Sequence, residues 1–396
     1  MLKIGIIKEG KKPLDKRVPL SPEQCKFVES KFGIQVLVQS SKHRCFSDEE
    51  YIKLGLNVVN DISSCDILLG VKEVPIYDLI PNKTYCFFSH TIKEQPYNKK
   101  LLQSILKNKI RLIDYETITN ESYKRLIGFG RYAGIVGSYN GLLVYGKKYN
   151  LYSLKPAYLC DNYDEVKYEL LKIKLPPVKI VVTGSGRVAT GVKEILNHAS
   201  IKQVSSNEFL TSKFDEPVYV QLTSLDYNKI KKGFEKGNTS FYTNPEKFDS
   251  DFLKYAYEAS LFISSHYWNP NAPKLFYLSD LSSPKFNIST IADITCDING
   301  SVPTTIKSSS IRKPVYDVNK QGLEVKPYSF DQLSVMAVDN LPCELPRDAS
   351  IDFGEELCQH IIPYLLKDDG RINRATITTS QGNLNTPYLY LKNYVS

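Results

Sequence analysis

Residues 1–116 alternate between short apolar runs typical of strands and segments typical of helices. The strand-like runs are KIGII, IQVLVQ, CDILLG, TYCFFS and IRLIDY, and the helices are expected to start at Pro22, near Asp48 and near Asn98. Ser21 and Gln24 form a capping-box pattern around Pro22, which suits the first position of a helix. Such alternation predicts an α/β fold, with a mostly parallel sheet covered by helices.

Three residues suited to acid–base chemistry follow these apolar runs. Lys72 comes after CDILLG, His90 after YCFFS and Glu116 after IRLIDY. In an open α/β sheet, ligands bind beyond the carboxyl ends of the strands, so the three side chains are expected to face one site. A site with these groups supports proton transfer.

Further along, a glycine-rich turn lies between an expected strand and an expected helix. The segment at residues 128–149 is first expected to cross into a second domain, as a helix packed closely against backbone. KIVVTGSGRVATGVKEIL then follows the G-x-G-x-x-G/A pattern of dinucleotide-binding folds. A pyrophosphate would lie on the N-terminus of the helix, where the unpaired N–H groups favour negative charge. The expected cofactor contacts are Gly184, Ser185, Gly186, Arg187, Val188 and Ala189.

The choice between NAD and NADP depends on the next expected strand, IKQVS. An acidic residue is expected about 20 residues beyond the glycines, but residues 205–207 read Ser-Ser-Asn. Glu208 could reach a ribose hydroxyl if the strand is longer. Alternatively, Ser205 with Arg187 or Lys202 could accept a 2′-phosphate. The sequence leaves both cofactors open and slightly favours NADP(H).

Two later strands are expected to end near His266 and Asp297. His266 is interpreted as a structural histidine. Asp297 is expected to lie near the nicotinamide, although the pair Asn299-Gly300 that follows it also suits a turn.

Composition and charge bear on the other classes of function. The 396 residues carry a formal net charge of +8, and Lys and Arg are spread along the chain, so no nucleic-acid partner is expected. Without a signal peptide or a run of about 18 apolar residues, the chain is expected to be cytoplasmic, with no membrane contact. The eight cysteines show no CxxC pair and no zinc spacing, so no metal site is expected.

Seven segments carry a resemblance to a known family. They are KPLDKRVPLSP, GVKEVP, FFSHTIKEQ, RLIDYE, GFGRYAGIVG, ADITCDINGS and VDNLPCELPRDAS. In this order, over nearly the whole chain, they resemble the lysine-forming saccharopine dehydrogenases and the lysine ketoglutarate reductase domain of bifunctional lysine-degrading enzymes, within the alanine dehydrogenase superfamily. The resemblance implies two Rossmann-like doubly wound domains flanking a cleft. Residues 1–130 and 318–396 would form the substrate domain, and residues 131–317 the dinucleotide-binding domain.

The resemblance also implies a reaction and roles for individual residues. An NAD(P)-dependent oxidoreductase of this kind joins L-lysine to 2-oxoglutarate and reduces the imine to saccharopine, or runs the reverse. His90 would transfer protons, and Lys72 would act as the base for the secondary amine. Glu73 and Glu116 would balance the charges of these two residues. The residues implied to bind the substrates are Arg17, as a bidentate partner of a carboxylate, and Lys12, Lys93 and Gln95.

Two other functions remain open at this point. One is an amino-acid dehydrogenase of the alanine type, and the other is a non-catalytic dinucleotide-binding subunit that resembles the soluble part of transhydrogenase. Taken singly, the residues also have ordinary explanations, such as a surface ion pair for Lys72 and Glu73 or a helix cap for His90. The shared order of the motifs favours the saccharopine branch, as a monomer or a small homo-oligomer, and leaves the physiological direction open.

Overall fold

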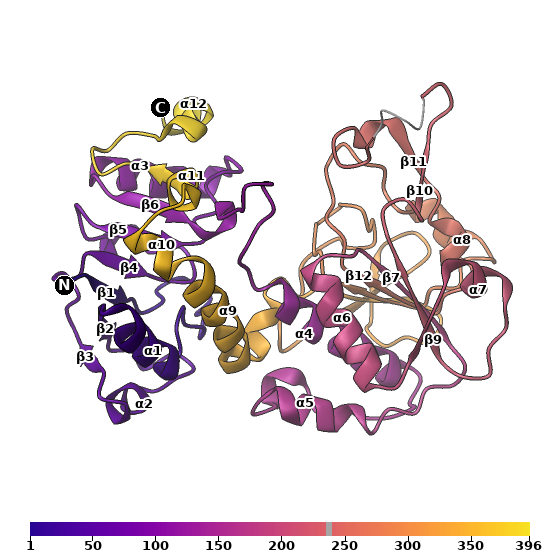
Figure 1. Ribbon diagram of the computed structural model, residues 1–396. Helices are drawn as coiled ribbons and strands as arrows, with labels where there is room; N and C mark the ends of the chain where they lie inside the picture. The colour runs from indigo at the N-terminus through magenta and orange to yellow at the C-terminus, as the bar shows by residue number, and fades with distance from the viewer. Residues whose placement is uncertain (235–239) are drawn as a thin grey trace. The chain divides into compact units, whose positions relative to one another are not determined.

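The computed structural model describes residues 1–234 and 240–396. They form two compact units (Figure 1): unit 1 comprises Met1–Phe129 and Pro346–Ser396, and unit 2 comprises Gly130–Leu345. Each unit has a sheet of mainly parallel strands with helices, which confirms the expected α/β fold. The return to unit 1 was expected at residue 318 but occurs at Pro346, because strands within residues 315–336 extend the sheet of unit 2.

Unit 1 contains every strand and helix predicted for residues 1–116. Its strands are β1 (Lys3–Ile6), β2 (Gln35–Gln39), β3 (Asn57–Val59), β4 (Ile67–Leu69), β5 (Thr84–Phe87), β6 (Arg111–Asp114) and β17 (Thr376–Thr378). Its helices are α1 (Pro22–Phe32), α2 (Asp48–Lys53), α3 (Lys99–Lys107), α9 (Pro346–His360), α10 (Ile362–Leu366), α11 (Arg371–Ala375) and α12 (Lys392–Val395). The capping box predicted for α1 is confirmed, since Ser21 and Gln24 each accept the other's backbone N–H with their side chains.

The sheet of unit 1 has the strand order β17-β6-β5-β4-β1-β2-β3. Strands β1 to β6 are parallel and follow the 3-2-1-4-5-6 order of Rossmann folds, whereas β17 joins β6 in the antiparallel direction. Successive residues pack on opposite faces, so Leu69 belongs to a core shared with α1 and α9 and Leu68 to a core shared with α3. The order reverses between β1 and β4, which is where ligands bind in such sheets.

Unit 2 begins with the helix expected at residues 128–149, which is α4 (Gly130–Lys148). Its other helices are α5 (Tyr163–Leu170), α6 (Arg187–His198), α7 (Ser206–Thr211) and α8 (Leu253–Ala256). Its strands are β7 (Lys179–Thr183), β8 (Lys202–Val204), β9 (Val218–Leu222), β10 (Asn228–Ile230), β11 (Phe248–Ser250), β12 (Leu261–Ser264), β13 (Thr290–Asp293), β14 (Val315–Val318), β15 (Glu324–Val325) and β16 (Leu333–Met336). As predicted, β7 and α6 flank the glycine-rich turn.

The main sheet of unit 2 has the strand order β15-β14-β16-β13-β12-β7-β9-β8. Strands β14 and β15 are antiparallel to their neighbours, and the remaining strands of this sheet are parallel. The third strand of the unit, β9, lies between β7 and β8, so β8 is an edge strand. Unit 2 therefore exchanges two strands relative to the usual 3-2-1-4-5-6 order.

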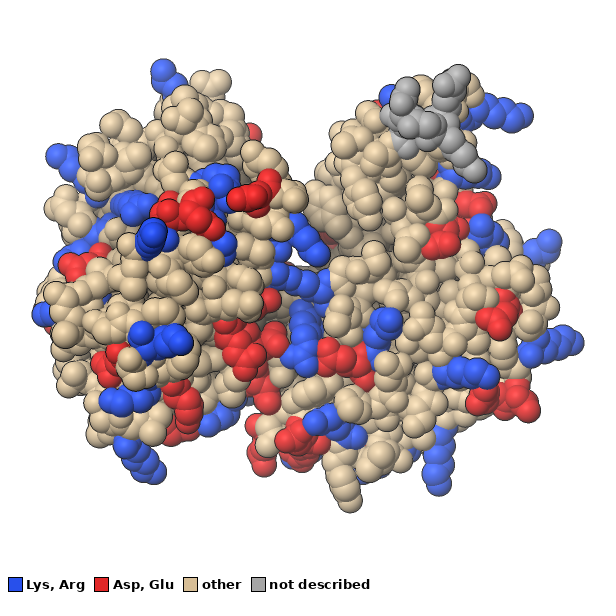
Figure 2. All heavy atoms as spheres, viewed as in Figure 1, with Lys and Arg blue, Asp and Glu red and all other residues tan. Residues whose placement is uncertain are grey.

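The described residues contain neither a membrane-spanning helix nor a cluster of metal ligands. None of the helices in residues 1–234 and 240–396 is long and apolar enough to cross a membrane. Within the same residues, no three His, Cys, Asp or Glu side chains are grouped so that they could hold a metal ion. On the face shown in Figure 2, Lys and Arg side chains of both units are interspersed with Asp and Glu.

Candidate active site

The acid–base residues predicted from the sequence lie beyond the carboxyl ends of adjacent strands in unit 1. Strand β4 leads to Lys72 and Glu73. Strand β5 leads to His90, and β6 leads to Glu116. Because these three strands are parallel neighbours in the sheet, all four residues follow the same edge.

Glu73 is at the centre of this group. It is only 8% exposed, its Oε1 lies 2.8 Å from His90 Nδ1, and its Oε2 accepts a hydrogen bond from Lys11 Nζ at 2.6 Å. Burial raises the pKa of Glu73, but the hydrogen bond and charge of His90 and the hydrogen bond from Lys11 outweigh it and lower the pKa to about 2. Glu73 is therefore a carboxylate that holds two nitrogen groups. Lys11 was not predicted as part of the site.

The environment of Lys72 favours its neutral form. Burial lowers the pKa of Lys72, and the positive charges of Arg17 and Lys11 lower it further. The carboxylates of Glu73 and Asp15 act in the opposite direction. This balance of burial, cations and carboxylates is the one that a lysine base requires.

The backbone at Lys72 is held by a buried carboxyl group that sequence analysis did not single out. Glu9 accepts hydrogen bonds from the backbone N–H of Val71 at 2.7 Å and of Lys72 at 2.9 Å. Burial raises the pKa of Glu9 to about 8, although these two hydrogen bonds oppose the shift. The sequence does not predict this role, because nothing near Glu9 in the chain indicates that its side chain will bind the backbone after β4.

A second buried carboxyl group, Asp114, ties the ends of β5 and β6 together. It accepts from the backbone N–H of Ser89 at 3.1 Å and of Glu116 at 2.7 Å, and also from the Ser89 hydroxyl. Burial raises the pKa of Asp114 to about 6. Asp114 thus fixes the residues next to His90 and at Glu116, and it too was missed, although the motif RLIDYE contains it.

Glu116 pairs with a residue predicted to bind substrate. Its Oε1 lies 3.5 Å from Lys93 Nζ, and Lys93 is 61% exposed. Glu116 Oε2 is buried and has no hydrogen-bond partner among the described residues. An acceptor in this state suits a donor on a bound molecule.

The other predicted substrate-binding residues have different surroundings. Arg17 is 2% exposed, makes bidentate hydrogen bonds to Asp15 at 3.0 and 2.6 Å, and lies 4.1 Å from the centre of the Phe129 ring. Gln95 accepts a hydrogen bond from the Tyr97 hydroxyl. Lys12 is exposed. The structure therefore gives Arg17 an acidic partner that was not anticipated.

A pocket of about 420 Å³ opens beside this group in unit 1. Its lining includes Lys11, Lys12, Glu73, Tyr97 and Asn98. The pocket thus brings Lys12 to the same space as the Glu73 carboxylate. Asn98 also donates a hydrogen bond to the His90 carbonyl at 3.3 Å.

In unit 2 the geometry of the glycine-rich turn fits a dinucleotide. Gly184 has φ +102°, and a Cβ there would lie 2.6 Å from the Ser265 carbonyl oxygen, so only glycine is accommodated. A Cβ on Gly186 would meet no atom within 4 Å, which leaves room for a pyrophosphate at the N-terminus of α6. Ala189 is fully buried in the first turn of that helix.

The remaining predicted residues of unit 2 lie at different places. Ser205 caps α7, where its side chain accepts from the Glu208 backbone N–H. β13 ends at Asp293, so Asp297 falls in an exposed turn, with its carbonyl accepting from Gly300 N–H at 2.8 Å. The structural interpretation of His266 is confirmed, because its ring nitrogens lie 2.7 Å from Thr183 Oγ1 and 2.9 Å from Ser301 Oγ.

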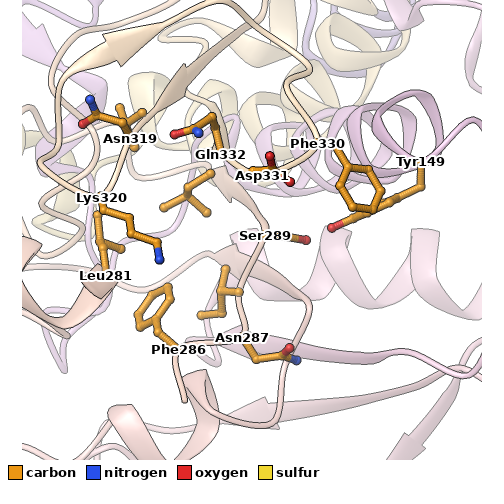
Figure 3. A pocket seen from close by; sticks show the side chains of 13 residues that line it. Tyr149, Leu281, Phe286, Asn287, Ser289, Asn319, Lys320, Phe330, Asp331 and Gln332 are labelled. Atoms are coloured by element: carbon orange, nitrogen blue, oxygen red, sulfur yellow. The ribbon is translucent and has the colours of Figure 1, made fainter. Parts of the chain in front are cut away.

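Figure 3 shows a pocket of about 280 Å³ elsewhere in unit 2. Ser289 and Gln332, which line it, come just before β13 and β16. The pocket therefore lies at the amino ends of the parallel strands, opposite the glycine-rich turn. Since α/β sheets bind nucleotides at the carboxyl ends, we do not assign the cofactor to this pocket.

Known proteins resemble this chain in sequence and in fold. Residues 5–136 match the family described as alanine dehydrogenase/PNT, N-terminal domain. The mouse alpha-aminoadipic semialdehyde synthase is 29% identical over 429 residues, which cover 96% of this chain and 46% of that protein. The chain therefore spans about half the length of this relative.

Two further comparisons cover both partners almost completely. The saccharopine dehydrogenase [NAD(+), L-lysine-forming] of Schizosaccharomyces pombe is 26% identical over 377 residues, or 90% of each chain. A solved L-alanine dehydrogenase covers 100% of both chains with a TM-score of 0.65 and 15% identity, and so shares the fold. Residues 5–136 therefore match the alanine dehydrogenase/PNT N-terminal domain family, and the expected resemblance of the chain to the saccharopine dehydrogenases is confirmed.

Proposed function

We propose that this protein is an NAD(P)-dependent saccharopine dehydrogenase of the lysine-forming type, which joins L-lysine to 2-oxoglutarate and reduces the product to saccharopine, or runs the reverse. The observation that carries the proposal is the buried Glu73 carboxylate, which holds His90 and Lys11 next to Lys72. The fission yeast relative is named a lysine-forming saccharopine dehydrogenase, which supports the choice of lysine and saccharopine.

His90 is the proposed proton carrier for the condensation. An amine and an oxo acid form an imine through a carbinolamine, which must gain and lose protons. Because Nδ1 of His90 is engaged by Glu73, Nε2 is the ring nitrogen that we assign to exchange protons with the substrate. Lys11 and Glu73 keep the ring in place without taking part in the transfer.

Lys72 is the proposed base for the substrate nitrogen. The secondary amine of saccharopine must be neutral before its C–N bond is oxidised, so a group nearby has to accept its proton. Burial and the charges of Arg17 and Lys11 lower the pKa of Lys72, which increases the neutral fraction able to do this.

The ionic groups of the substrates find partners on the same edge of unit 1. Lys12 and Lys93 are exposed cations that would bind carboxylates, together with Arg17 beside Asp15 and with Gln95. The buried Oε2 of Glu116 would accept a hydrogen bond from a substrate ammonium group. Unit 2 would hold the cofactor through backbone N–H groups of residues 185–188, and the bound cofactor supplies or accepts the hydride.

A spectrophotometric assay of the purified full chain tests this proposal. Oxidation of NADH or NADPH should require both lysine and 2-oxoglutarate. In Lys72→Met and His90→Asn, kcat should fall by about 100-fold or more, the usual contribution of a general acid or base. Lys100→Met, which removes an exposed lysine on α3, is the matched control and should keep its activity.

Other results of this assay would contradict the proposal. Oxidation with pyruvate and ammonium, but not with lysine and 2-oxoglutarate, would place the protein with the alanine dehydrogenases. If neither NADH nor NADPH is oxidised in any mixture, the result would favour a non-catalytic binding subunit. Unchanged turnover in Lys72→Met would remove that residue from the mechanism.

A further inference from the structure

The strand beside the glycine-rich turn of unit 2 is not the one that follows the turn in the sequence. In Rossmann folds ordered 3-2-1-4-5-6, the residue that recognises the adenosine ribose follows the strand adjacent to the first strand. In unit 2 the neighbours of β7 are β12 and β9, and β8 lies beyond β9 at the edge of the sheet. The equivalent position is therefore the carboxyl end of β9.

Hydrogen bonds join this end of β9 to the turn. The Gly184 N–H donates to the Leu222 carbonyl at 2.8 Å, and Gln221 Nε2 donates to the Gly184 carbonyl at 3.0 Å. Leu222 is the last residue of β9 and pairs with Thr183, the last residue of β7. A molecule whose pyrophosphate lies on the turn would thus extend over the residues that follow Leu222.

Asp226 brings a carboxylate to this place. Its Oδ2 accepts from the Thr223 backbone N–H and from the Thr223 hydroxyl, each at 2.7 Å. Because Thr223 is the first residue beyond β9, these bonds return the carboxylate to the strand end, although Asp226 comes later in the chain. Asp226 is partly exposed, and its Oδ1 accepts no hydrogen bond from the described residues.

The segment after β8 is poorly placed for the same task. β8 lies two strands from β7, or about 10 Å, and its last residue, Val204, pairs with Val220 rather than with the end of β9. Ser205 and Glu208 bind each other in the capping box of α7. Lys202 begins β8, so it lies at the opposite end of the strand, where it pairs with Glu216 at 3.3 Å.

We infer that Asp226 at the end of β9 recognises the adenosine ribose and that the protein uses NAD(H) in preference to NADP(H). A carboxylate accepts hydrogen bonds from the ribose hydroxyls of NAD and repels the 2′-phosphate of NADP. The inference rests on the proposed dinucleotide site. It reverses the slight preference for NADP(H) drawn from residues 205–207, because those residues follow the edge strand.

Titration of the full chain with NADH and with NADPH, without substrates, tests this inference through nicotinamide fluorescence. The unmodified protein should bind NADH at least about tenfold more tightly than NADPH. Asp226→Asn keeps an acceptor for the Thr223 N–H and removes the charge, so it should reduce the ratio of the two affinities about tenfold. Glu208→Gln removes one carboxylate beside the neighbouring strand, keeps the capping-box pattern, and should leave the ratio within about twofold.

Each result separates this inference from the proposed reaction. If both cofactors bind and Asp226→Asn leaves the ratio of their affinities unchanged, the ribose assignment is wrong. Tighter binding of NADPH than of NADH would also overturn it. Neither result contradicts the proposed reaction. Failure of both cofactors to bind overturns the dinucleotide site itself. Competition against NADH needs no variant: adenosine 5′-monophosphate should compete better than adenosine 2′,5′-bisphosphate, and the reverse order overturns the inference.

Discussion

Two buried carboxyl groups hold the backbone next to the proposed acid–base residues. Glu9 binds the N–H groups of Val71 and Lys72, and Asp114 binds those of Ser89 and Glu116. Glu9 thus holds the segment after β4 to the segment after β1, and Asp114 holds the segment after β5 to the segment after β6. A general acid or base must lie within hydrogen-bond reach of the proton that it transfers, so Glu9 and Asp114 are positioning residues.

Asp114→Asn is expected to lower the free energy of unfolding by about 1–3 kcal/mol, because the amide NH2 cannot accept from Ser89 and leaves a buried group unsatisfied. Turnover should also fall, mainly through kcat, because Ser89 adjoins His90 and Glu116 belongs to the proposed site. Urea unfolding and steady-state kinetics measure the two effects.

The control for this substitution is Asp61→Asn. Asp61 is exposed and accepts a hydrogen bond from Ser63 N–H at 2.8 Å. If the asparagine does not accept this hydrogen bond, a water molecule can accept it instead. The free energy of unfolding of this variant should change much less than that of Asp114→Asn. An equal loss of unfolding free energy in the two variants would show that the buried hydrogen bonds of Asp114 do not stabilise the protein more than the exposed ones of Asp61.

At the scale of secondary-structure elements, the crossing of α4 and α6 sets the position of the proposed phosphate-binding turn. A Cβ on Gly134 of α4 would lie 1.9 Å from the Val188 carbonyl oxygen, and a Cβ on Gly191 of α6 would lie 2.0 Å from the Arg131 carbonyl oxygen. The two helices therefore meet backbone to backbone. The sequence predicted close packing of the first helix, and the partner proved to be the helix that begins at the turn.

Gly134→Ala is expected to destabilise unit 2 by about 3 kcal/mol, because the new methyl group meets backbone that cannot move aside. The same change should weaken dinucleotide binding, since it displaces Val188 in the first turn of α6. Thermal unfolding and cofactor titration measure both effects.

Gly137→Ala in the same helix is the matched comparison. Its Cβ would approach Cγ1 and Cδ1 of Ile294, at 2.5 and 2.7 Å, which belong to a flexible side chain. Alanine also favours the helical state by about 0.5–1 kcal/mol over glycine. A smaller loss, about 1 kcal/mol, is expected, and a Gly137→Ala variant as unstable as Gly134→Ala would refute the backbone argument.

At the scale of the whole molecule, buried carboxyl groups couple folding to pH in both units. Burial raises the pKa of Glu9 in unit 1 and of Glu344 in unit 2 to about 8. Unfolded glutamate loses its proton near about pH 4.3. Between this pH and about 8, the folded protein holds protons that the unfolded chain has released, so these groups make stability fall as the pH rises.

Glu344→Gln tests this coupling in unit 2. Glutamine resembles the protonated acid that Asn140 Nδ2 contacts at 2.8 Å, and it does not titrate. Between about pH 7 and 8, the variant should therefore gain stability relative to the unmodified protein, by up to about 1.4 kcal/mol per pH unit. Calorimetric unfolding at both pH values measures the difference, in a range above the titration of His266, whose pKa burial lowers to about 4.

The exposed residue Glu246 supplies the control for the pH experiment. Glu246→Gln should shift stability equally at both pH values, because the side chain is in contact with water in the folded chain as in the unfolded one. A Glu344→Gln variant with the same pH dependence as the unmodified protein would show that Glu344 is ionised in the fold.

Local signals in the sequence were enough for the elements and for much of the proposed site. The capping box at Ser21 and the glycines at 184 and 186 act within a few residues, so their structures could be predicted. The positions of Lys72, His90 and Glu116 after strands followed from hydrophobic runs in the same way. The partners of these residues could not be predicted, since Lys11 reaches Glu73 across 62 positions of the chain.

Strand order is the clearest property that required the folded chain. The sequence showed that β7 is followed by a helix and the strand β8, but not that β9 would pair with β7 and leave β8 at the edge. The end of the second unit was misplaced at 318 for the same reason, because β14 and β16 join its sheet through long-range pairing. Residue types and local periodicity define which segments form strands, whereas hydrogen bonds between distant segments define which strand ends, and which side chains, meet.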